Sequence, residues 1–105
     1  MRGVIVMAAL VATSSAMATP PAPDYARAYA MAARCMVFNT YVNDEAMARV
    51  AFDAWKRLGE LQGLTNRKMN DDMTWAVANE NVQLHQHADY RAQMQVDCRA
   101  LGWAR

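Results

Sequence analysis

The sequence contains few residues that break helices or act as simple nucleophiles. Proline does not occur after Pro23, serine does not occur after Ser15, and only three glycines follow Pro23, at positions 59, 63 and 102. The lack of serine excludes a serine nucleophile from most of the chain. No Gly-x-Ser-x-Gly, His-Glu-x-x-His or glycine-rich phosphate loop occurs either. The sequence therefore predicts no enzyme.

Neither sign of charge dominates, and no long apolar run follows the N-terminal segment. Lys and Arg number 11 against 10 Asp and Glu, which gives a formal net charge of +1. Such a chain has no strong field to attract nucleic acid or an anionic membrane. No apolar stretch reaches the roughly 20 residues that cross a bilayer. We expect neither a nucleic-acid partner nor a membrane span.

The first eighteen residues have the pattern of a secretory signal peptide. Arg2 precedes an uncharged, mostly apolar run over residues 3–12, and Ala16-Met17-Ala18 supplies the small-x-small pattern that signal peptidase accepts. The run has about half the length of a membrane-spanning helix. We expect cleavage after Ala18 and export to the periplasm or the cell exterior. A buried N-terminal helix is the alternative.

The remaining chain divides into a short proline-rich lead-in, residues 19–23, and a single helical domain, residues 24–105. Residues 19–105 include sixteen alanines and few β-branched side chains, a composition that favours helix. Cys35 and Cys98 are the only cysteines. In an oxidising compartment an even pair predicts one intramolecular disulfide, with an intermolecular bridge or a reactive thiol pair as alternatives.

The first two helices are delimited by polar residues that cap helix N-termini. Asp24 is the expected N-cap of a helix that runs to about Val42, and its apolar spacing places Cys35 on the buried stripe. Asn43 is the expected N-cap of a second helix, which ends at one of the glycines 59 and 63.

The last helical segment starts at Asn70, which is followed by two aspartates, and runs from Asp71 to Leu101 without glycine or proline. An unbroken helix of that length would measure about 46 Å and would carry Cys98 far from Cys35. A disulfide allows at most about 7 Å between Cα atoms. A reversal over residues 85–89, capped by Asp89, brings the cysteines level. The sequence therefore predicts an all-α antiparallel bundle of four short helices stapled by one disulfide, with three helices as the alternative.

Two histidines near that reversal are candidate metal ligands. His85 and His87 are two residues apart, so on a helix they point about 200° apart and could share a metal only in a turn. His85 and Asp89 are four apart and could face the same side. With another ligand, His85, His87 and Asp89 could bind a metal, or methionine thioethers could complete a copper or haem site. The alternative is solvated polar residues beside core-filling methionines, and we expect no cofactor.

Residues 64–68 resemble one short motif of a known class. Leu64 and Thr65 match the first two positions of the Leu-Thr-x-x-Gln signature of helical periplasmic stress chaperones, and Lys68 stands where that signature has Gln. On this five-residue motif, the resemblance implies an exported helical chaperone.

The chain has more apolar and aromatic side chains than so few helices can hide from water. We therefore expect a small exported, non-enzymatic protein that acts by protein–protein interaction, as a chaperone, an inhibitor or an accessory subunit. Its partner would be another protein or a second copy of itself, and the sequence leaves the residues of the partner surface unknown. The alternative is a small metal- or haem-binding protein that uses His85 and His87 with methionine ligands.

Overall fold

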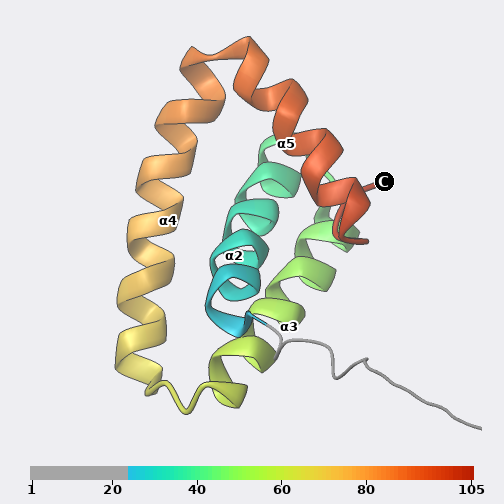
Figure 1. Cartoon of the computed structure of the whole chain (residues 1–105). Coiled ribbons are helices and arrows are strands. Elements are labelled where there is room, and N and C mark those ends of the chain that lie inside the picture. The colour runs from blue at the N-terminus through green and yellow to red at the C-terminus, as the bar shows by residue number, and fades with distance from the viewer. Residues whose placement is uncertain (1–23) are drawn as a thin grey trace, which may run out of the picture.

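The computed structural model describes residues 24–105, which form four α-helices (Figure 1). They are α2 (Tyr25–Tyr41), α3 (Glu45–Leu61), α4 (Asn66–Gln86) and α5 (Ala88–Ala100). The described part of the chain contains no strand, and the predicted all-α bundle is confirmed. None of these helices is long and apolar enough to cross a membrane. The predicted signal peptide, 1–18, and lead-in, 19–23, lie outside the described residues.

Three of the four helices begin with a side chain that caps the helix. Asp24, Asp44 and Thr65 each accept a hydrogen bond from the backbone N–H three residues further on, at 3.0, 3.2 and 3.1 Å. Such a cap satisfies one of the N–H groups that have no partner within the helix. The predicted cap at Asp24 is therefore confirmed.

Two predicted helix starts are wrong. Asn43 has a φ of 61°, a left-handed turn conformation, and Asp44 is the N-cap of α3 in its place. α4 begins at Asn66, four residues before Asn70, because the Thr65 hydroxyl caps it. Asp72, expected in the first turn, lies further inside α4 and accepts from the Lys68 ammonium one turn earlier, at 2.7 Å.

The chain breaks between α4 and α5 at His87, whose backbone is extended (φ −132°, ψ 102°). The predicted reversal over residues 85–89 is therefore confirmed, but Asp89 is not its cap. His87 holds the N-cap position without a side-chain hydrogen bond, and Asp89 lies in the first turn of α5. The Arg91 guanidinium donates to the Leu84 carbonyl at 2.7 Å and so satisfies a carbonyl near the end of α4.

α2 is the central helix and packs against the other three (Figure 1). Helices that follow one another along the chain run in opposite directions, so α2 and α4 are parallel. Tyr29 of α2 accordingly pairs with Asp72 of α4. A second pair, Arg34 of α2 and Glu80 of α4, lies further along in the same direction. α4 lies at one side of the bundle and leaves much of its surface uncovered (Figure 1).

The core consists of two groups of buried side chains, one along each half of α2. One surrounds the predicted disulfide, which is confirmed: Cys35 and Cys98 are bonded, both are fully buried, and their Cα atoms are 5.6 Å apart. The larger side chains around it are Phe38, Leu84 and Met94. The second group joins Tyr29 of α2, Trp55 of α3 and Met69 of α4. It lies beside a groove between α2 and α4.

Candidate functional site

A groove of about 300 Å³ lies between α2 and α4 and is lined mainly by apolar side chains. Ala30 and Ala33 of α2 and Ala76 of α4 are small, and they leave room between the two helices. Trp55 lines the groove from α3 and is almost fully buried. The volume is at the lower end of the range for ligand pockets. The groove is therefore suited to one apolar group rather than a large ligand.

One end of the groove is closed by a chain of polar contacts. The Tyr29 hydroxyl donates to Asp72 Oδ2 at 2.9 Å, and Asp72 Oδ1 accepts from Lys68 Nζ at 2.7 Å. The Tyr29 ring stacks on Trp55, with ring centroids 5.6 Å apart. The Asp72 charge is thus compensated inside the protein. It does not require a ligand.

The buried indole nitrogen of Trp55 has no hydrogen-bond partner within residues 24–105. Beside it, burial first, and then the hydrogen bond and charge of Asp72, raise the pKa of Tyr29 to about 12. The Tyr29 hydroxyl therefore stays protonated and keeps its bond to Asp72 across the physiological range.

Tyr29→Phe is expected to lower the free energy of unfolding by about 1 kcal/mol at neutral pH, because the hydrogen bond to Asp72 is lost. It should also change the alkaline behaviour. A tyrosine pKa raised from 10.0 to about 12 stabilises the fold below pH 10, and this stabilisation is lost as the pH rises towards 12. Urea unfolding at several pH values should show a shallower alkaline loss in the variant. Tyr25→Phe, at a more exposed tyrosine, is the control and should leave the profile unchanged.

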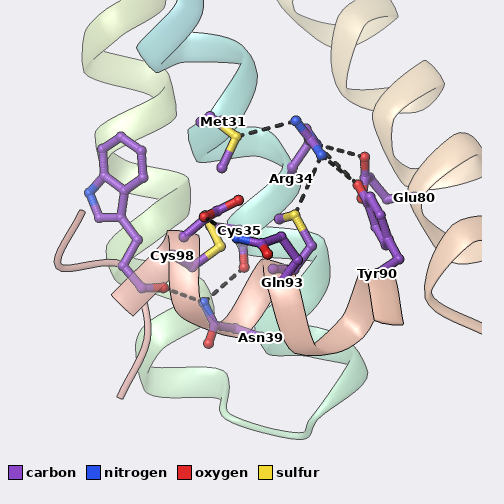
Figure 2. Close-up of a disulfide and its surroundings, with 11 residues drawn as sticks. Met31, Arg34, Cys35, Asn39, Glu80, Tyr90, Gln93 and Cys98 are labelled. Carbon is purple, nitrogen blue, oxygen red and sulfur yellow. Dashed lines mark hydrogen bonds and ion pairs between the residues drawn. A yellow bond between two sulfur atoms is a disulfide. The ribbon is translucent and has the colours of Figure 1, made fainter. Parts of the chain in front are cut away.

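At the other end, three polar side chains from three helices meet beside the disulfide (Figure 2). Arg34 Nε donates to Glu80 Oε2 at 2.9 Å, and Arg34 Nη2 donates to the Tyr90 hydroxyl at 2.7 Å. The Tyr90 hydroxyl in turn donates to Glu80 Oε1. Glu80 is buried, and its carboxylate is held by both partners. We call these residues the Arg34–Glu80–Tyr90 network.

The pKa values of Arg34 and Tyr90 are both raised within the Arg34–Glu80–Tyr90 network. Burial alone would lower the pKa of Arg34, but the Tyr90 hydrogen bond and the Glu80 charge raise it above its ordinary value. Burial, assisted by Glu80, raises the pKa of Tyr90. The Met31 sulfur also accepts from Arg34, at 3.3 Å (Figure 2). The Met94 sulfur accepts from Arg34 at 3.5 Å. These two thioethers therefore face a cation.

Trp75 lies at the rim of the groove and is 69% exposed, although it is among the largest apolar side chains of the protein. It lies in a charge-poor stretch of α4. From 73 to 86 the only residue with a formal charge is Glu80, which is buried and paired with Arg34. Val77 and Val82 are also exposed there.

The predicted metal ligands do not form a cluster. His85 Nδ1 donates to the Asn81 carbonyl at 2.8 Å, and its ring packs edge-on against Tyr41, with centroids 4.9 Å apart. His87 is exposed at the break, and Asp89 is exposed in the first turn of α5. Among residues 24–105 no three His, Cys, Asp or Glu side chains are placed to hold a metal ion. The metal or haem site stays a prediction.

Trp75 and the groove residues were not among the sites that the sequence indicates. Tyr29 and Asp72 are 43 residues apart, and Arg34 and Glu80 are 46 apart, so no local motif marks either pair. The one local signal is that Glu80 is the only formally charged residue from 73 to 86. No known protein family, curated protein or solved structure matches this chain. The function is therefore argued from the residues themselves.

Proposed function

We propose that the chain is an exported, non-enzymatic binding protein that recognises a protein partner through Trp75 and the groove between α2 and α4. The observation that carries the proposal is the 69% exposure of Trp75 at the rim of an apolar groove. Burying the exposed part of an indole contributes on the order of 3 kcal/mol. Large aromatic side chains of this kind are typical anchors of protein interfaces.

The chemistry of the groove favours binding over catalysis. Its carboxylates and its guanidinium are held by Lys68, Tyr29, Tyr90 and each other, so they are engaged within the protein. A general acid or base has to reach its substrate, and a nucleophile needs a neighbouring base. A groove with satisfied polar ends and an apolar middle is suited to an uncharged apolar group. A chaperone, an inhibitor and an accessory subunit would all use such a surface.

Export is supported by two independent observations. Residues 1–18 have the composition of a signal peptide, with a cleavage pattern that ends at Ala18. The buried Cys35–Cys98 disulfide belongs to proteins of oxidising compartments, such as the periplasm and the cell exterior. Both are consistent with a mature chain that begins at Thr19 and works outside the cytoplasm.

Photocrosslinking tests the binding surface directly. A benzophenone amino acid replaces Trp75 in the full-length protein, exported in cells through its own first eighteen residues, and a matched variant carries it at Leu61, which is 56% exposed on α3. We expect a discrete adduct from position 75 and none of the same mass from position 61. Adding Ala30→Glu, which puts a charge at the exposed edge of the groove, should abolish the adduct, whereas Ala26→Glu should not. Equal labelling from both positions, or no adduct, contradicts the proposal.

A further inference from the structure

We propose that residues 101–105 form a strap over the Cys35–Cys98 disulfide, and that local opening of this strap lets a dithiol reductant reach the bond while the four helices stay folded. The strap follows α5 and begins at Leu101, shortly after Cys98. Its Trp103 and Ala104 pack against the group of buried side chains around the disulfide. Both cysteines are fully buried, so a covering segment has to move before a reductant can reach either sulfur.

Two polar contacts hold the strap against the helices. The buried side chain of Asn39 donates to the Trp103 carbonyl at 2.6 Å and to the Cys35 carbonyl at 2.8 Å. Figure 2 shows Asn39 beside the disulfide. The Arg105 guanidinium donates to both carboxylate oxygens of Asp44, at 2.7 and 3.3 Å. Asn39 thus ties the strap to the backbone of one of the bonded cysteines.

The strap is held less firmly than the helices. Leu101 and Gly102 are exposed, and the ion pair between Arg105 and Asp44 joins a side chain that is 69% exposed. Ion pairs at such exposure contribute little to stability. A cavity of about 180 Å³ beside Ala104 and Arg105 leaves this side of the strap incompletely packed. Segments with few buried contacts open while the rest of a protein stays folded.

The reaction that follows opening is thiol–disulfide exchange with a dithiol. A thiolate of the reductant attacks one cysteine sulfur, a mixed disulfide forms as the original bond breaks, and the other cysteine leaves as a thiolate and takes up a proton. The second thiol of the reductant, as a thiolate, then attacks the mixed disulfide and releases the remaining cysteine. The protein gains two electrons and two protons, and the dithiol becomes a disulfide. The rate of the first attack depends on how often the strap is open.

Gly102 allows the strap to be weakened selectively. Its φ is 78°, and the Cβ of an alanine there would meet no atom of the described chain within 4 Å beyond its own neighbours. Gly102→Ala therefore strains the closed strap without a clash. Gly63, in the turn between α3 and α4, has a φ of 71° and equally open surroundings. Gly63→Ala is thus a matched control, with the same strain in a different turn.

Reduction by dithiothreitol in native buffer tests the inference. The purified oxidised protein is mixed with excess reductant, samples are quenched with iodoacetamide, and mass spectrometry counts the alkylated cysteines. We expect Gly102→Ala to raise the reduction rate about fivefold and Gly63→Ala to leave it within about twofold of the wild type. Urea below the unfolding transition should leave the wild-type rate nearly unchanged, because opening the strap exposes little surface. Circular dichroism confirms that each variant is folded.

The outcomes distinguish local opening from global unfolding. Equal acceleration by the two variants would show that the disulfide is reached only when the whole chain unfolds, and it overturns the proposal. A rate that rises steeply with urea, or that Gly102→Ala does not change, also overturns it. Acceleration by Gly102→Ala alone supports the strap. The experiment involves no binding partner, so its result is independent of the proposed binding function.

Discussion

Replacing Cys35 and Cys98 together by alanine is expected to lower the free energy of unfolding by about 4 kcal/mol. The disulfide joins residues 63 apart in sequence and so closes most of the described chain into one loop. In the chain-entropy model its main effect is to restrict the unfolded state. Domains of this size have about 5–15 kcal/mol of stability in total. The variant should therefore lose a substantial part of its stability.

Urea unfolding under oxidising conditions measures this loss. Alanine is the suitable replacement because both cysteines are fully buried, where a serine hydroxyl would add a desolvation cost. Wild-type protein unfolded in the presence of a reductant is the control, and it should match the alanine variant. We also expect a larger dependence on urea concentration, since the unlinked denatured chain exposes more surface. A loss below about 1 kcal/mol would contradict a stabilising disulfide.

Arg34→Met is expected to have the second largest effect, a loss of about 3 kcal/mol. It leaves the Glu80 carboxylate, in a side chain only 6% exposed, without its positive partner. The cost lies at the lower end of the range for broken buried ion pairs, because the Tyr90 hydroxyl still donates to Glu80. Methionine keeps most of the unbranched stem, so the change removes chiefly the charge and its hydrogen bonds.

A double variant distinguishes the charge effect from a packing effect. Arg34→Met combined with Glu80→Met leaves no buried charge, and it should recover most of the stability lost by the single change. Arg57→Met, at an exposed arginine on α3, is the control and should stay within about 0.5 kcal/mol of the wild type. Unfolding in urea gives all three values. A double variant less stable than the single one would show that the ion pair is not the cause.

The four-helix division could be predicted because one constraint acts over a long distance. The disulfide requires Cys98 to lie level with Cys35, which forces a reversal that neither glycine nor proline marks. Local signals were less reliable for the start of α4. The residues after Asn70 are typical of a helix start, but Thr65 caps the helix earlier. Asp72 instead makes a tertiary hydrogen bond with Tyr29.

The candidate site could not be predicted, because its residues meet only in the folded chain. The exposure of Trp75 depends on the position of α4 at the side of the bundle (Figure 1), and aromatic side chains on helices are more commonly buried. The Arg34–Glu80–Tyr90 network joins residues from three helices, as Figure 2 shows. Charged side chains give no sequence signal of which partner they will find.

The most direct test of the groove as a binding site is the crosslink from position 75, made in exporting cells with and without Ala30→Glu. We expect a discrete adduct from position 75 that Ala30→Glu abolishes and Ala26→Glu leaves unchanged. An adduct that persists with Ala30→Glu, or no adduct from position 75, would contradict the groove as the binding site.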